Sequence, residues 1–308
     1  MSKRWWFGKQ RTVAQNTLRY NFKVMRIILG FAILFTYIVM IWGGVVRSTD
    51  SGLACPSWPL CYGDFSLPKD ISAKLEMGHR TVSSLAGLFV LLTFIYVWKR
   101  FKGLPRLTSA LALLFTVSAA LTGMKMIKSE APNLKYVSHM LLESFHIYES
   151  MLILGFLVLT YRFIQKDKPT GDGIPLWAYA FALATMITGV LVRYTGSGEA
   201  CGHEWPTCAG ALIPDLSKWQ TALQFIHRNL AYLTWLAFLL YLVVSRSPLA
   251  LYTFALINLQ FVFAISMVLS GFFLPLVFLD TASGFFLFAW LTYHLKLGEP
   301  QPSLRTAW

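Results

Sequence analysis

Charged residues are scarce in this sequence. Only 13% of the 308 residues are charged, whereas 56% are hydrophobic, and the mean hydropathy is +0.55. A soluble domain carries about 25% charged residues, so the composition excludes an ordinary water-soluble protein. Long runs of Leu, Phe, Val, Ala and Trp take the place of the missing charge.

These apolar runs are long enough to cross a membrane. A helix needs about 20 apolar residues to span the hydrocarbon core of a bilayer. Eight such runs occur, and they predict an all-α integral membrane protein with eight transmembrane helices. Their bounds are 26–46, 75–98, 107–127, 134–163, 175–194, 219–244, 249–271 and 275–295.

From the sequence we also expect neither a cleavable signal peptide nor a basic face for nucleic acid. The first run ends in Trp42-Gly43-Gly44, which is not a small-residue cleavage site. The net charge is +13, but the basic residues flank the runs instead of forming one surface, which excludes nucleic acid as a partner. They gather before the first run, at 99–106 and at 162–168. The positive-inside rule therefore predicts a multi-pass protein of the cell (plasma) membrane with both termini in the cytoplasm.

Cysteine is rare, and the four cysteines form two pairs, Cys55/Cys61 and Cys201/Cys208. Both pairs fall in loops that the charge pattern assigns to the outside, where oxidising conditions allow disulfides. Each pair could be a disulfide that staples its loop, or a redox pair that relays electrons or holds a substrate covalently. Both interpretations are open for the first pair, and the staple is favoured for the second.

The two cysteine loops belong to an internal repeat. Residues 43–61 match residues 189–208 at an offset of 146 to 147 residues, including an arginine, a Trp-Pro pair and both cysteines. Residues 76–80 match residues 224–228 at an offset of 148. Because each copy contains an even number of spans, both copies have the same orientation, as parallel repeats do.

The repeat predicts two four-helix bundles as the organisation of the chain. The N-terminal half is residues 1–165, the linker is residues 166–173, and the C-terminal half is residues 174–308.

Ionisable residues inside the runs are functional candidates, because burying them in a bilayer is costly. Glu76, His79 and Arg80 lie in the outer third of the second run, and Glu76 and His79 share a helix face. The fourth run also starts outside, near Leu134, so His139 lies about 8 Å down it, at a depth similar to that of His79. These two imidazoles could bind one haem iron from both sides, with Arg80 available for a propionate.

His146 is the alternative to His139 as the partner of His79. It lies two turns deeper on the same helix face, where it could bind the iron, serve a proton path or only pack. The depth argument favours His139. A single membrane histidine often only joins two helices by a hydrogen bond, but a His-Arg pair that recurs in both halves favours the cofactor interpretation.

The second half has fewer of these residues. It keeps His227 and Arg228, but the outer end of the eighth run, residues 277–283, contains no histidine. Glu76 is replaced there by Gln224, and an amide cannot take or relay protons as a carboxylate can. This asymmetry predicts a reactive first half and a supporting second half.

The motifs resemble those of the haem A synthase family, in its Bacillus-like branch with loop cysteine pairs. They are Gly-Gly-x-Val-Arg-x-Thr-x-Ser-Gly-x-x-Cys-Pro-x-Trp-Pro-x-Cys at 43–61 and Glu-x-x-His-Arg at 76–80, and the resemblance covers all eight spans. It implies that the C8 methyl group of haem O is oxidised to a formyl group, which gives haem A for terminal oxidases. It also implies that the N-terminal half holds the substrate haem O and the C-terminal half a haem b cofactor.

The resemblance implies a role for individual residues. Glu76 would be the catalytic carboxylate, with Cys55 and Cys61 as the redox-active pair. His79 and His139 would be ligands of the substrate haem. His227 would be one ligand of haem b, whereas the second ligand departs from the family, whose histidine is replaced by residues 280–283.

The implied partners are a haem O synthase that supplies the substrate, membrane lipid, an unidentified electron acceptor and further copies of the chain in a homo-oligomer. The departure at the second haem b ligand motivates an alternative, which is a non-catalytic membrane b-type cytochrome or a divergent haem-binding paralogue.

Overall fold

The structure is a computed structural model that describes residues 3–64, 66–133, 135–165 and 173–297, with side chains from Lys23 onward. These residues form eight α-helices, each with a stretch long and apolar enough to cross a membrane, and no β-strand. The all-α class and the eight predicted spans are therefore confirmed. Of the predicted linker, only Gly173 lies within the described residues.

The helix bounds follow the apolar runs closely. They are α1 Lys3–Ser48, α2 Ile71–Arg100, α3 Leu104–Lys128, α4 Val137–Ile164, α5 Leu176–Tyr194, α6 Trp219–Ser245, α7 Pro248–Leu269 and α8 Leu274–His294. A short 3-10 turn, Ala131–Asn133, precedes α4.

Local signals at the helix starts agree with these bounds. The carboxylate of Asp70 accepts a hydrogen bond from the amide of Ala73 at 3.1 Å and caps α2. The hydroxyl of Ser247 accepts one from the amide of Ala250 at 3.2 Å and caps α7, whose first residue is Pro248. Side-chain oxygens at this position satisfy backbone donors that a helix leaves unpaired, so both starts are fixed by sequence.

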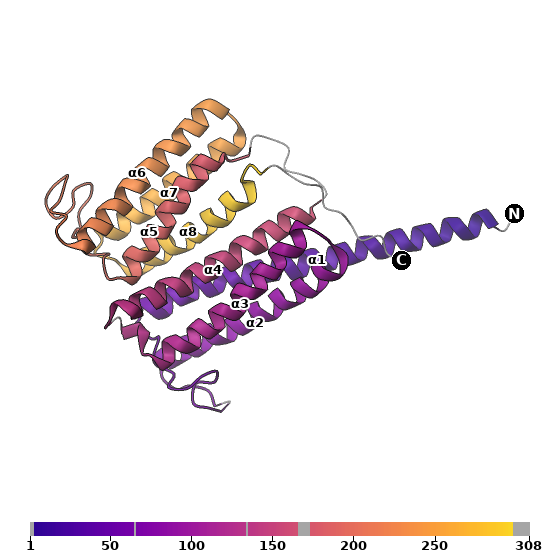
Figure 1. Ribbon diagram of the computed structural model, residues 1–308, viewed down its shortest axis with the longest axis horizontal. Coiled ribbons are helices and arrows are strands. Elements are labelled where there is room, and N and C mark those ends of the chain that lie inside the picture. The colour runs from indigo at the N-terminus through magenta and orange to yellow at the C-terminus, as the bar shows by residue number, and fades with distance from the viewer. Residues whose placement is uncertain (1–2, 65, 134, 166–172, 298–308) are drawn as a thin grey trace.

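The helices pack in two groups, α1–α4 and α5–α8 (Figure 1). Each group has its own apolar core, one centred on Leu29 and Leu157 and the other on Phe238 and Leu291. A third apolar cluster, which includes Met40, joins α1, α4, α5 and α8 between the groups. The parallel-repeat relation of the two groups stays a prediction.

Helix α4 is the central helix of the molecule. About two thirds of its most apolar window is buried (67%), whereas the corresponding values for the other spans are 17% to 28%. It lies against α1 and α3 on one side and against α5 and α8 on the other. Polar groups on α4 therefore face protein rather than lipid, as ionisable residues in a membrane helix must.

Two tyrosine hydroxyls are among the groups whose hydrogen bonds tie the two helix groups together. The Tyr37 hydroxyl on α1 donates to the carbonyl of Ala282 on α8 at 2.8 Å, and the Tyr148 hydroxyl on α4 donates to the carbonyl of Ile187 on α5 at 2.8 Å. Both bonds join residues far apart in the sequence. They fix the two groups against each other along the α1–α8 and α4–α5 contacts.

The two cysteine loops lie at the same end of the bundle, away from the N-terminus (Figure 1). Disulfide bonds Cys55–Cys61 and Cys201–Cys208 are both formed, and all four cysteines are buried. The pairing expected for the loop cysteines is thus confirmed. The side of the membrane on which this end lies stays a prediction.

Candidate functional site

The first cavity lies mainly among α1, α2, α3 and α4 and has a volume of about 730 Å³. Most of its wall is apolar. Several ionisable side chains converge on it: Arg47, Asp50, Glu76, His79, Arg80, Glu143 and His146. An apolar cavity of this size with a few convergent polar groups is the usual form of a small-molecule or cofactor site.

Glycines make room for both imidazoles of the first cavity. A Cβ atom at Gly43 would lie 3.2 Å from Cε1 of His79, and one at Gly123 would lie 3.6 Å from Cε1 of His146. The Nδ1 atom of each ring is buried without a hydrogen-bond partner among the described residues. The His146 ring also interacts with the backbone of Ala119, which restricts its orientation. A neutral imidazole is a common metal ligand, and both rings line the cavity.

His139, which the depth argument favoured, does not line this cavity. It lies at the start of α4, with its ring edge-on to Tyr136 at a centroid distance of 5.0 Å. The observed helix starts explain the difference. His79 lies eight residues into α2 and His146 nine residues into α4, about 12 and 14 Å along their helices, whereas His139 lies only about 3 Å along α4. His146 is therefore the histidine at the depth of His79.

The Glu76 carboxylate is fixed between α2 and the first cysteine loop. Its Oε2 accepts a hydrogen bond from the backbone amide of Cys55 at 2.7 Å, and its Oε1 pairs with the Arg80 guanidinium. The side chain is 4% exposed, so this carboxylate is nearly enclosed. The loop that carries the disulfide thus also positions the carboxylate of the cavity.

Arg80 lines the first cavity but turns its guanidinium to the loop. It donates from Nη1 to the carbonyls of Ser57 at 2.5 Å and Pro59 at 3.3 Å, and from Nη2 to the carbonyl of Cys55 at 3.4 Å. Together with its pairing to Glu76, these contacts employ the donors that were expected to reach a propionate. Arg80 is positioned as a clamp on the cysteine loop.

The second cavity lies mainly among α5, α6, α7 and α8 and has a volume of about 800 Å³. His227 lines it from α6, and its Nδ1 lies 3.1 Å from the Thr188 hydroxyl. A Cβ atom at Gly189 would lie 3.0 Å from Cε1 of His227, slightly closer than the 3.2 Å for the corresponding glycine, Gly43, in the first cavity. A hydrogen bond to one ring nitrogen orients the other, so Nε2 of His227 is the nitrogen offered to a ligand.

The second cysteine loop is clamped in the same manner as the first. Arg228 donates from Nη1 to the carbonyl of Thr207 at 2.6 Å, and Gln224 donates from Nε2 to the carbonyl of Gly198 at 3.3 Å. The His-Arg pair therefore separates its tasks in both halves. The histidine faces the cavity, and the arginine holds the loop.

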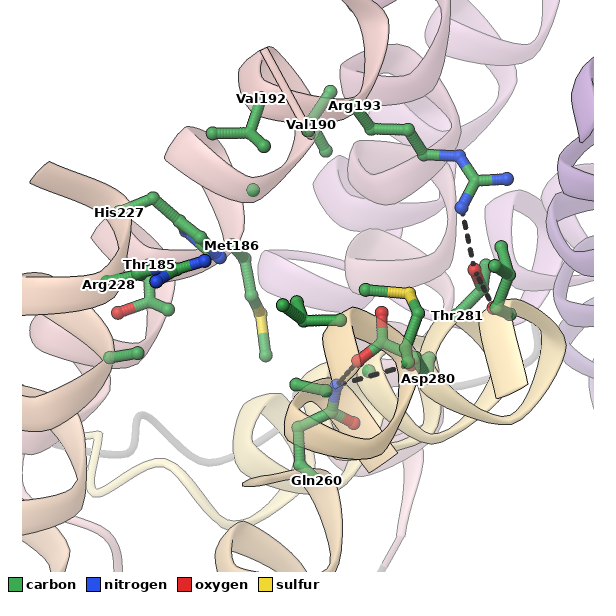
Figure 2. A pocket seen from close by; sticks show the side chains of 18 of the residues that line it. Thr185, Met186, Val190, Val192, Arg193, His227, Arg228, Gln260, Asp280 and Thr281 are labelled. Atoms are coloured by element: carbon green, nitrogen blue, oxygen red, sulfur yellow. Dashed lines mark hydrogen bonds between the residues drawn. The ribbon is translucent and has the colours of Figure 1, made fainter. Parts of the chain in front are cut away.

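The wall opposite His227 is formed by Asp280 and Gln260 (Figure 2). Gln260 donates from Nε2 to Oδ1 of Asp280 at 2.7 Å, and the Ser283 hydroxyl donates to Oε1 of Gln260 at 2.5 Å. As the sequence indicates, this part of α8 has no histidine. The side chain that it contributes to the cavity is the carboxylate of Asp280. The polar contact crosses from α7 to α8.

Four residues line both cavities: Arg47, Asp50, Ile147 and Tyr194. Nη1 of Arg47 lies 3.2 Å from the carboxylate of Asp50, and Nε of Arg47 lies 4.0 Å from that of Glu143. Arg193, its counterpart in the repeat, donates to the carbonyl of Gly44 at 3.1 Å. These arginines join the two halves at the level of the cavities.

Sequence reasoning assigned no role to Arg47, Arg193 or Gln260. The recurrence of both arginines at one offset of the repeat was a usable signal. Gln260, a polar residue in the middle of the seventh apolar run, was another. The sequence does not show which side chains on different helices contact one another. Those contacts turn these side chains toward the cavity walls.

The residues present suit a flat macrocycle that brings its own equatorial ligands. No group of three or more His, Cys, Asp or Glu able to hold a bare metal ion occurs within the described ranges. A haem iron instead needs only one or two axial ligands from the protein. His79 with His146, and His227 by itself, can supply such ligands beside glycines that leave space for the rings.

Comparison with known proteins gives several relatives. A protein named haem A synthase from Halalkalibacterium halodurans is 29% identical over 205 residues, which is 62% of this chain and 66% of that protein. One from Bacillus cereus is 28% identical over 284 residues, or 85% of this chain and 89% of that protein. One from Symbiobacterium thermophilum is 31% identical over 197 residues, or 58% of this chain and 62% of that protein. The chain thus matches just under two thirds of the length of some relatives and most of others.

A family profile described as cytochrome oxidase assembly protein matches residues 26–75 and 69–292, which is most of the chain and all eight spans. The loop motifs, the two disulfides and the helical architecture agree with this match. The chain belongs to the COX15-CtaA family of cytochrome oxidase assembly proteins.

Proposed function

We propose that the protein is a haem A synthase, an oxidoreductase that converts the C8 methyl group of haem O into the formyl group of haem A. The observation that carries this proposal is the first cavity, in which Glu76 stands beside two imidazoles, His79 and His146. Relatives named haem A synthase support the same activity.

His79 and His146 would hold the substrate haem in the first cavity. Both rings lie at a similar depth, on helices α2 and α4, and both line the cavity. These imidazoles would hold the haem among the other residues of the cavity wall. His146 replaces His139 in this proposal because His139 lies outside the cavity.

The reaction requires a group that handles protons. Conversion of a methyl group to a formyl group with one oxygen atom from water releases four protons and four electrons. Glu76 lines the cavity, and its carboxylate contacts the backbone of the loop at the end of the bundle. Glu76 is therefore placed to accept protons released at the methyl group and to pass them toward the cysteine loop. An electron acceptor of the membrane must take the electrons.

The second cavity would hold haem b through His227. When bound, haem b supplies one-electron transfer beside the first cavity. Arg47 and Tyr194 line both cavities. A haem in the first cavity and a haem in the second would therefore contact the same two residues. Thr188 orients the His227 ring, and Gly189 leaves it space.

The remaining proposals concern the setting of the enzyme. The protein spans a membrane eight times; we place its termini in the cytoplasm and its cysteine loops outside the cell membrane. A haem O synthase would deliver the substrate, which is too apolar to cross water freely. A homo-oligomer is compatible with the lipid-exposed faces of the helices.

The test is production of the chain in a host that makes haem O, followed by chromatography of the extracted haem. We expect haem A or its hydroxylated intermediate. The variant Glu76→Gln keeps the size of the side chain but not its proton affinity, and it should lower product about 10²- to 10⁴-fold while haem binding remains.

Glu149→Gln is the matched control. Glu149 is also a buried carboxylate, on α4, but it accepts a hydrogen bond from the Ser118 hydroxyl and lines neither cavity. We expect this variant to form product at the wild-type level. Extracts that contain only haem B and haem O from the wild-type protein would refute the proposal.

A non-catalytic b-type cytochrome is the second candidate, because the second cavity offers one imidazole. It predicts a purified protein whose haem is entirely of the b type, with reversible oxidation and no conversion of haem O.

A further inference from the structure

Only one of the six histidines lines the second cavity. These histidines are His79, His139, His146, His203, His227 and His294, and all lie within the described residues. His203 packs against Phe272 in the loop region, and His294 packs against Trp290 at the far end of α8. A haem in this cavity can therefore receive one imidazole, from His227.

The wall across the cavity from His227 has no imidazole. Its polar groups are the carboxylate of Asp280 and the amide of Gln260. Figure 2 shows His227 on one side and Asp280 with Gln260 on the other. Oδ1 of Asp280 accepts the hydrogen bond from Gln260, whereas the described residues provide no hydrogen bond to Oδ2. Gln260 is held in turn by the Ser283 hydroxyl at 2.5 Å. The carboxylate is fixed in orientation and keeps one oxygen for a guest in the cavity.

The first cavity shows what this wall lacks. There the last helix of the group, α4, offers His146, beside Gly123. In the second group the last helix, α8, offers Asp280 instead. A carboxylate held by an amide is a hydrogen-bond acceptor, and it is a poor substitute for an imidazole as a haem ligand.

We propose that the second cavity binds haem through His227 alone and leaves the opposite haem face open to a small ligand, with Asp280 and Gln260 as the polar wall of that open face. This inference rests on the proposed function only in placing a haem in the second cavity. The ligand class is a small molecule of the size of carbon monoxide or water. The polarity and access of such a wall decide whether a haem binds small ligands or only transfers electrons.

Thioethers are the competing ligands. Met151, Met186 and Met267 line the same cavity, and a methionine can fill an axial position of haem. Met186 extends into the cavity from α5, the helix that also carries Thr188 and Gly189 beside His227 (Figure 2). It therefore approaches from the side of His227, whereas Met151 and Met267 come from α4 and α7, and the experiment tests all three methionines.

The experiment uses the full chain with His79→Ala and His146→Ala, so that haem in the first cavity does not contribute to the spectra. We expect this protein to retain haem B with a high-spin ferric spectrum and, once reduced, to bind carbon monoxide in proportion to its haem. Adding Asp280→His should supply the missing imidazole, convert the spectrum to low spin and abolish carbon monoxide binding. Asp280→Asn, the size-matched control, should remain high-spin and reactive.

Three results would overturn the inference. They are loss of all haem from the double variant, a low-spin spectrum that carbon monoxide does not change, and a low-spin spectrum that becomes high-spin on Met151→Leu, Met186→Leu or Met267→Leu. Conversion of haem O is measured separately in the otherwise wild-type chain. Failure of conversion together with a carbon monoxide-reactive second haem would refute the proposed activity and leave this inference standing.

Discussion

The first cavity has two imidazoles and the carboxylate of Glu76, whereas the second has one imidazole and, at the position that corresponds to Glu76, the amide of Gln224. Both have a histidine packed on a glycine, a loop stapled by a disulfide and an arginine that holds the loop. The scaffold is therefore common to both. The difference lies in Glu76 against Gln224, and in the last helix of each group, where α4 offers His146 and α8 offers Asp280. Reaction chemistry should follow those positions rather than the scaffold.

The largest expected effect separates His146 from His139. His146→Ala removes an imidazole from the wall of the first cavity and should abolish tight binding of haem O there. His139→Ala removes a ring that lines neither cavity and should leave binding unchanged. Optical titration of haem O into the two purified variants measures the contrast. Equal loss in both variants would contradict the assignment of His146.

A smaller effect should follow from the ring support in the second cavity. Thr188→Val removes the hydroxyl that lies 3.1 Å from Nδ1 of His227. Loss of such a supporting hydrogen bond typically lowers metal affinity about 10- to 100-fold. Haem B should therefore dissociate more readily from the second cavity, while haem O binding in the first is retained. Transfer of each haem to apomyoglobin measures the two rates, and identical changes in both would remove the distinction.

Removal of the first disulfide and removal of the second should have different effects on conversion. Replacing Cys201 and Cys208 by serine should lower stability by about 2–4 kcal/mol with little effect on conversion. Replacing Cys55 and Cys61 should cost similar stability and also slow conversion, by up to about 10²-fold, because the Cys55 amide holds the Glu76 carboxylate.

Thermal unfolding and product analysis of the two double variants separate these effects. A first-pair variant with residual conversion favours a disulfide that positions Glu76. Complete loss of conversion without a change in the haem-bound fold would favour the redox interpretation of that pair.

Much of the fold was predictable from the sequence, because about 20 apolar residues in a row have few alternatives to a membrane helix. The helix starts were less well predicted. The helix α2 begins at Ile71, whereas its apolar run begins at 75, because its first turn is amphipathic; α4 begins at Val137, not at 134. These small shifts place His139 near the start of α4 and bring His146 to the depth of His79.

Side-chain direction was the other part that the sequence could not supply. The repeat identified His79 and His227 as equivalent and also identified the arginines beside them. It did not show that Arg80 reaches the loop carbonyls, nor that Gln260 on α7 fixes Asp280 on α8. Those contacts depend on how neighbouring helices are rotated, which a single sequence leaves unspecified.

The most direct test of the division of labour is the haem content of two single variants produced with a supply of haem O. Chromatography of the extracted haem should show haem B without haem O or haem A in His146→Ala. It should show haem O with little haem B in His227→Ala. The same mixture of haems in both variants would contradict the claim that the first cavity holds the substrate and the second the cofactor.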